Sequence, residues 1–174
     1  MPFGLVPPSI DAQTQVGRQG SMDTLVIGLG NVLASDDAAG IEVVRALSSR
    51  GLPPDVRVVE GATVGLGLID LILDTGRAIL VDAVRGGASP GTVLRLNERE
   101  LSRAALRPFS AHNLGLVEVL KLGDVLYAER MPREIILFGI VAECVEPYRE
   151  GLSPSVRAAI PRAVDAIMAE IARQ

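Results

Sequence analysis

Two adjacent carboxylates, Asp36 and Asp37, follow a glycine turn that comes directly after the short apolar run 25–27. Gly28 and Gly30 allow a tight turn, because glycine adopts backbone conformations that a β-carbon forbids. An amphipathic, helix-like segment begins directly after the acids. A strand, a glycine turn, polar groups and a helix start are typical of the corner of an α/β sheet where ligands bind. The sequence therefore predicts a ligand site at this corner.

The spacing of the glycines disfavours a dinucleotide as that ligand. The turn at Gly28 supplies only the first part of G-x-G-x-x-G, and Leu33 occupies the last glycine position. Glu60 stands roughly where an acid would contact a ribose, so this alternative stays open. However, Asp36 and Asp37 would repel a phosphate. Two acids beside a strand end favour a cation instead.

Two further polar residues are placed to join Asp37. Asp82 ends the continuous apolar run 78–81, and His112, the only histidine, lies just before a predicted helix. Two carboxylates and one imidazole suit a divalent ion such as nickel or zinc, which could polarise a carbonyl and lower the pKa of a bound water. Structural roles remain open: Asp36 as a helix cap, Asp82 as an acceptor for a backbone amide, and His112 as an ordinary surface or core residue.

A second polar cluster comprises Glu143, Cys144 and Glu146. The thiol could bind a metal, but a buried, inert cysteine is an equal alternative because no histidine is nearby in the sequence. As Cys144 is the only cysteine, no intrachain disulfide can form, which favours a reducing, cytoplasmic compartment.

The composition predicts one domain with an aliphatic core. The chain has 174 residues, of which 48% are hydrophobic and only 3% aromatic. The net charge of −4 and the pI near 5.1 give no reason to expect nucleic acid or an anionic membrane as a partner. No apolar run approaches the roughly 20 residues of a membrane span.

The first 21 residues differ in composition from the remainder. They are rich in Pro, Gln, Gly and Ser, which predicts disorder, and they lack the pattern of a signal peptide. We interpret residues 1–21 as a disordered extension, either native or added for expression, with Met22 as an alternative start. We expect residues 22–174 to form a single α/β domain.

Strands and helices alternate along this domain. The predicted strands are 25–27, 56–60, 78–82, 91–96 and 134–141. The predicted helices are 37–49, a short helix ending at 73, a turn at 100–105, 114–122, and a long C-terminal helix that starts at Ser153-Pro154. This alternation predicts a three-layer helix–sheet–helix sandwich around a mostly parallel, twisted sheet of about five strands.

Segment 28–40, Gly-Leu-Gly-Asn-Val-Leu-Ala-Ser-Asp-Asp-Ala-Ala-Gly, resembles the N-terminal motif of the hydrogenase maturation proteases. The resemblance continues in order through 81–83, 112–116, 145–147 and 151–156, and it covers nearly the whole chain from Met22 onward. One departure is Gly-Ala-Thr at 61–63, where relatives commonly have Gly-Gly-Thr.

This resemblance implies an endopeptidase that removes the C-terminal extension of a nickel–iron hydrogenase large-subunit precursor after nickel insertion. The metal-binding residues of the family correspond to Asp37, Asp82 and His112, and we expect them to be the catalytic residues as well. The nickel would come from the precursor, and the isolated enzyme could hold another divalent ion. Two alternatives remain: a related α/β peptidase of the spore germination protease type, and a non-catalytic nucleotide- or metal-binding module.

Overall fold

The computed structural model describes residues 23–62, 65–103, 107–108 and 115–173. Both the extension predicted at 1–21 and His112 therefore lie outside the described residues. The strands are β1 (Thr24–Leu29), β2 (Val56–Ala62), β3 (Arg77–Arg85), β4 (Val93–Asn97), β5 (Arg107–Pro108) and β6 (Glu134–Val141). The helices are η1 (Ser35–Ala38), α1 (Ala39–Ser48), α2 (Gly67–Ile72), α3 (Glu98–Arg103), α4 (Leu116–Tyr127), η2 (Ala128–Arg130) and α5 (Pro154–Ile171).

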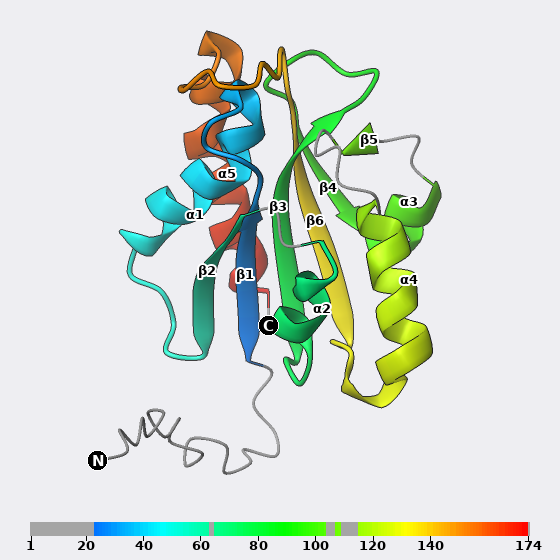
Figure 1. Cartoon of the computed structure of the whole chain (residues 1–174). Helices are drawn as coiled ribbons and strands as arrows, with labels where there is room; N and C mark the ends of the chain where they lie inside the picture. Colours follow the sequence, from blue (N-terminus) through cyan, green and yellow to red (C-terminus); the bar gives the residue numbers. More distant parts are fainter. Residues whose placement is uncertain (1–22, 63–64, 104–106, 109–114, 174) are drawn as a thin grey trace, which may run out of the picture.

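These elements form a three-layer α/β sandwich (Figure 1). The main path of the sheet runs β2-β1-β3-β6-β4, and the short β5 pairs with β3. Strands β2, β1, β3 and β6 are parallel to one another, whereas β4 is antiparallel to β6 and β5 is antiparallel to β3. Helices α1 and α5 cover one face, and α2, α3 and α4 cover the other. The predicted fold class is confirmed.

Each face of the sheet carries its own, largely aliphatic core, since successive strand side chains point to opposite faces. Ile79, Val81 and Ala83 of β3 pack with α1 and α5, and Ala78 and Leu80 pack with α2 and α4. The central strands are buried on both sides, which explains why their sequences are continuous apolar runs rather than alternating ones.

Several element boundaries differ from those predicted by a few residues, and three of these differences have a clear physical setting. Strand β3 continues past Asp82 to Arg85, because β6 is long enough to pair with it as far as Val84. Helix α1 begins only at Ala39, after the 3₁₀ turn η1. Helix α4 ends at Tyr127 rather than at residue 122. The amphipathic pattern did not predict its last turn, because the apolar residues of that turn are exposed.

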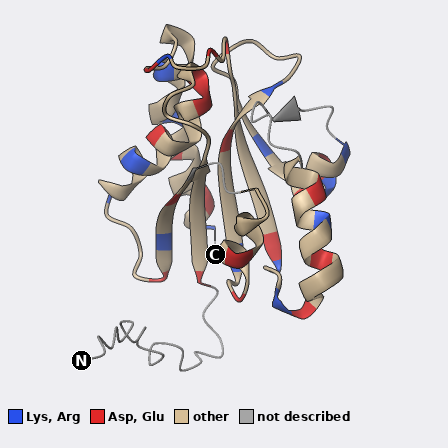
Figure 2. Cartoon of the chain, in the orientation of Figure 1, with Lys and Arg blue, Asp and Glu red and all other residues tan. Residues whose placement is uncertain are grey.

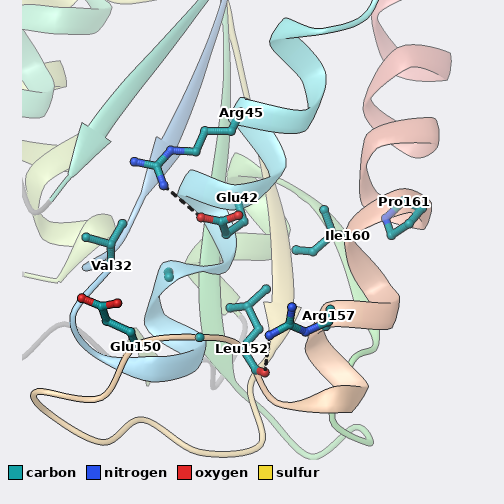
Figure 3. Close-up of a pocket in the computed structure, with 10 residues that line it drawn as sticks. Val32, Glu42, Arg45, Glu150, Leu152, Arg157, Ile160 and Pro161 are labelled. Carbon is teal, nitrogen blue, oxygen red and sulfur yellow. Dashed lines mark hydrogen bonds and ion pairs between the residues drawn. The ribbon is translucent and has the colours of Figure 1, made fainter.

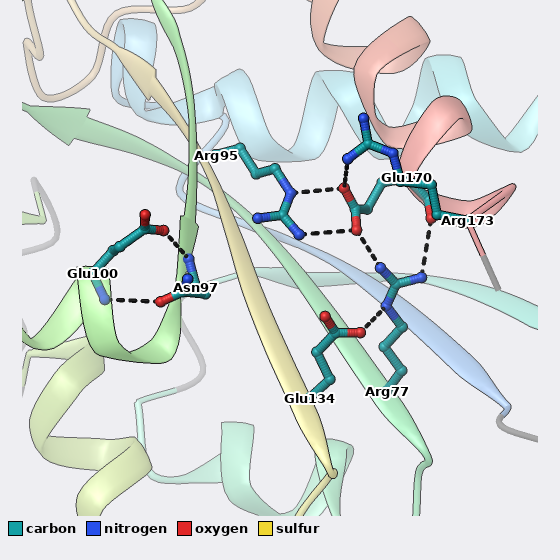
Figure 4. Close-up of polar contacts among 7 residues, drawn as sticks. All are labelled: Arg77, Arg95, Asn97, Glu100, Glu134, Glu170 and Arg173. Carbon is teal, nitrogen blue, oxygen red and sulfur yellow. Dashed lines mark hydrogen bonds and ion pairs between the residues drawn. The ribbon is translucent and has the colours of Figure 1, made fainter.

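A network of five charged residues joins the end of α5 to the starts of β3 and β6 (Figure 4). Glu170 is buried and contacts Arg77, also buried, and it pairs with Arg95 at 2.7 Å and Arg173 at 3.3 Å. The second carboxylate partner of Arg77 is Glu134, at 2.7 Å. Both ion pairs of Arg77 connect elements that are distant in the sequence, so the network fixes the C-terminal helix against the sheet.

Acidic and basic residues are interspersed along the described part of the chain (Figure 2). In that view the helices carry residues of both signs. None of the described helices has the length and apolarity needed to cross a membrane.

Candidate active site

The strand order reverses at the carboxyl ends of β1 and β3, the place where doubly wound sheets have their ligand-binding crevice. The chain leaves β1 toward β2 on one side and reaches β3 on the other side of β1, so its direction across the sheet reverses there. In open α/β sheets ligands bind at such a reversal. Asp37 lies in η1, which follows β1, and Asp82 lies one position beyond Val81, the last β3 residue that pairs with β1. Both predicted acids therefore lie at this crevice.

Two glycines allow η1 and α1 to lie directly on the sheet. Gly30 has a φ of +125°, and a Cβ there would lie 1.8 Å from the carbonyl oxygen of Asp37. A Cβ on Gly40 would lie 2.2 Å from the carbonyl oxygen of Val81, the residue before Asp82. Only glycine fits at these positions, so the motif brings the Asp37 segment against the Asp82 strand.

The two acids are buried near each other. The exposed fraction is 3% for Asp37 and 5% for Asp82, and the Oδ1 atom of Asp82 accepts the Ala83 amide at 2.8 Å. Burial, and after it the negative charge of Asp37, raise the pKa of Asp82 to about 7. Among the described residues no three His, Cys, Asp or Glu side chains form a metal-binding group. The predicted third ligand, His112, lies outside them, so the trio stays a prediction.

The raised pKa of Asp82 predicts a pH-dependent cost to folding. The carboxyl ionises near pH 3.8 when unfolded but near 7 when folded, so the free energy of unfolding falls as the pH rises between these values. In metal-free protein, Asp82→Asn should therefore raise that free energy at pH 8 by a few kcal/mol. Urea unfolding in EDTA measures this. The gain should shrink toward pH 4, and an equal gain at pH 4 and pH 8 would contradict the assignment.

Asp36 has a different role from the one predicted. Its side chain makes no helix-capping hydrogen bond. Instead, this fully buried carboxylate accepts hydrogen bonds from three backbone amides, those of Glu143 at 2.9 Å, Cys144 at 3.1 Å and Ser153 at 2.7 Å. It also accepts the Ser153 hydroxyl at 2.9 Å. Asp36 thus holds the loop that follows β6.

Backbone contacts reinforce this attachment between residues 31–38 and 142–153, which we name the paired loops. Ala34 forms a parallel β-bridge with Arg149. The Ser35 amide donates to the Arg149 carbonyl at 2.7 Å, and the Arg149 amide donates to the Leu33 carbonyl at 3.1 Å. The loop after β6 is therefore attached by several hydrogen bonds to the segment that contains η1, which carries Asp37.

The second polar cluster of the sequence does not form a site. Glu143 accepts the Ser155 hydroxyl at 2.6 Å, and Glu146 pairs with Arg149 at 2.8 Å. Cys144 is half-buried and its Sγ atom lies 3.6 Å from the Ser35 hydroxyl oxygen. The cysteine thus belongs to the paired loops.

One sequence signal could have separated Asp36 from Asp37. Consecutive residues of a helical turn point in different directions, so the two carboxylates cannot both face one ligand. One of them needs a second role, and the structure gives that role to Asp36. Its partners could not be predicted, because they lie 107 to 117 residues away in the sequence.

Asp36→Asn should loosen the paired loops without removing a predicted metal ligand. Asparagine keeps one acceptor oxygen but turns an amino group toward several donors, and a lost hydrogen bond to a charged acceptor costs on the order of 2 kcal/mol. Hydrogen exchange should therefore accelerate at the Glu143, Cys144 and Ser153 amides. The matched control is Asp124→Asn on the exposed side of α4. Unchanged exchange at those three amides would contradict the anchoring role.

Glu60 was the residue that left a dinucleotide site as an open alternative, and its carboxylate is bound by an arginine. Arg45 donates to both of its carboxylate oxygens at 3.0 Å, and this pairing lowers the pKa of Glu60. A ribose hydroxyl would have to displace this bidentate ion pair. The structure therefore gives no support to a dinucleotide site.

Comparisons with known proteins show which family this chain belongs to. Residues 41–170 match the family model described as hydrogenase maturation protease. The hydrogenase 2 maturation protease of Escherichia coli is 33% identical over 152 residues, which cover 86% of this chain and 91% of that protein. This chain belongs to the hydrogenase maturation protease family. It is therefore a hydrolase that cuts peptide bonds and not a non-catalytic binding module.

Solved structures of family members support the same conclusion. The hydrogenase maturating endopeptidase of E. coli superposes with a TM-score of 0.76 at 33% identity, covering 86% of this chain and 92% of that one. The nickel–iron hydrogenase maturation protease of Thermococcus kodakarensis superposes with a TM-score of 0.71 at 29% identity, covering 86% and 99%. The family resemblance predicted from the five sequence motifs is confirmed.

Proposed function

We propose that this protease removes the C-terminal extension of a nickel–iron hydrogenase large-subunit precursor after nickel has been inserted. Asp37, Asp82 and His112 would bind the nickel that the precursor carries, and this contact would distinguish a loaded precursor from an empty one. The nickel is thus part of the substrate.

The observation that carries this proposal is the placement of two buried carboxylates at one crevice. Asp37 lies in η1 after β1, and Asp82 lies in β3. Both are at the reversal of the sheet and almost fully buried. Two like charges out of water destabilise the fold unless a cation or a proton neutralises them. Carboxylate oxygens with one imidazole suit nickel, so the donor set fits a divalent ion.

Neighbouring residues of the chain would position Asp37 and Asp82 for contact with the nickel of the precursor. Gly30 and Gly40 let the Asp37 segment lie against β3, and the Ala83 amide fixes the orientation of the Asp82 carboxylate. Burial excludes water from both acids, which strengthens their interaction with a cation. A divalent ion held there would polarise the carbonyl of the scissile peptide bond.

A cleavage assay tests the proposal. It compares precursor that contains nickel with the same precursor prepared without nickel. We expect the enzyme to shorten only the loaded form and to release one intact C-terminal peptide. Gel electrophoresis follows the change in size, and mass spectrometry identifies the released peptide. Equal cleavage of both forms would remove nickel from the proposed recognition, and no cleavage of either form would contradict the proposed substrate.

A further inference from the structure

A groove of about 600 Å³ lies between α1 and α5, on the face of the sheet opposite the side chain of Asp82 (Figure 3). Asp82 is two residues after Leu80 in β3, so both side chains point to the face that α2 and α4 cover. The groove lies on the other face and is therefore separate from the crevice. Its volume is within the range of ligand-binding pockets. The apolar lining consists of Val32, Ala38, Leu152, Ile160 and Pro161.

The charged side chains of this groove differ in how they are paired. Arg45 is held by Glu42 at 3.0 Å and by Glu60 at 3.0 Å. The Arg157 guanidinium only donates to the Leu152 carbonyl, at 3.4 Å, and pairs with no carboxylate in the described part of the chain. Glu150 likewise has no cationic partner among the described residues. Arg157 and Glu150 therefore offer one positive and one negative group to an occupant.

The groove is continuous in sequence with the segment that carries Asp37. Ala38, which lines the groove, is the next residue after Asp37, and Val32 belongs to the same loop. The paired loops also expose apolar side chains, with exposed fractions of 39% for Val32, 48% for Leu33 and 96% for Tyr148. An extended chain could thus contact the groove and these side chains together on its way to the crevice.

We propose that this groove binds a segment of the precursor polypeptide that flanks the bond to be cut, with a carboxylate of that segment on Arg157. A polypeptide fits because it supplies aliphatic side chains for the lining together with charges of both signs. A phosphate-bearing ligand would meet Glu42 and Glu150. This inference rests on the proposed function, and it assigns the polypeptide-binding surface that the metal ligands alone do not provide.

Steady-state cleavage of nickel-loaded precursor tests the groove. Arg157→Gln should raise the KM about tenfold, as expected for the loss of one charge-assisted contact, and leave kcat within about twofold. Arg157→Glu should raise the KM further. The matched control is Arg50→Gln, which removes an exposed arginine that pairs with Asp165 at 3.5 Å and does not line the groove.

A photoreactive benzoylphenylalanine at position 160 gives a second readout that does not depend on turnover. It should crosslink to the precursor, and the crosslinked peptide should lie next to the cleavage position. The groove assignment is wrong if the wild-type enzyme cuts the precursor while the Arg157 variants keep the wild-type KM. It is also wrong if the crosslink joins two copies of this chain. In both cases the proposed function stands. If the wild-type enzyme does not cut the precursor, both proposals are wrong.

Discussion

Asp82→Asn protein is expected to leave a nickel-loaded precursor uncut. The substitution keeps the acceptor for the Ala83 amide but removes one of the two charges proposed to hold the ion. Because even residues that only support a metal ligand contribute 10- to 100-fold in affinity, the loss of a ligand should lower kcat/KM by at least about 100-fold. His112→Ala should have a similar effect through the loss of the imidazole.

The same variant separates loss of function from loss of structure. Asp82→Asn should be more stable than the wild type at pH 8, because its neutral side chain removes the cost of a buried carboxylate. A variant that resists urea better and yet does not cut the precursor shows that the carboxylate is required by the reaction. Processing at the wild-type rate would contradict the site.

Glu170→Ala should destabilise the fold more than any other single change in the described ion pairs. Glu170 is 3% exposed and its carboxylate contacts Arg77, which is 4% exposed. Removing one partner of a buried pair leaves the other charge poorly compensated, which typically costs about 3–5 kcal/mol. Urea unfolding at pH 7 measures the free energy of unfolding, and we expect a loss near the lower end of this range because Glu134 still pairs with Arg77.

Asp165→Ala on the same helix is the matched control. Its pair with Arg50 spans 3.5 Å between two exposed side chains, so its removal should change the stability little. The arginines, Arg95 first, lower the pKa of Glu170, so its contribution is present above its ordinary value of 4.5 and is lost as the pH falls below it. The difference between wild type and Glu170→Ala should therefore narrow in acid. A constant difference across this range would contradict a contribution from the charge.

Much of the fold was predictable because the sequence of each central strand is a continuous run of apolar residues. Segment 134–141 was predicted with the bounds that β6 has, since burial on both faces requires apolar residues throughout. The end of β3 was not predictable in this way. Whether the strand stops at Asp82 or continues depends on its pairing with β6, and Arg85 carries no signal of that pairing.

The site was predictable only in part for a related reason. Strand ends and glycine turns placed Asp37 and Asp82 at one edge of the sheet, which is where the structure has them. The role of Asp36 was beyond the sequence, because its four hydrogen bonds come from a loop at the far end of the chain. The Arg157 groove was equally hidden, since it forms only when α1 and α5 pack side by side.

The strand order has a consequence for when this enzyme matures on the ribosome. Strand β4 is synthesised before β6, yet β6 is the only partner of β4 in the described sheet. Strand β6 lies between β4 and β3. The carboxylate of Asp36 must likewise wait for the amide of Ser153. A nascent chain that has just passed residue 130 already contains Asp37 and Asp82 but lacks the strand and the loop that complete their surroundings. Folding to an active protease therefore requires the residues as far as Ser153 to have been synthesised, and it is governed by contacts between distant parts of the chain.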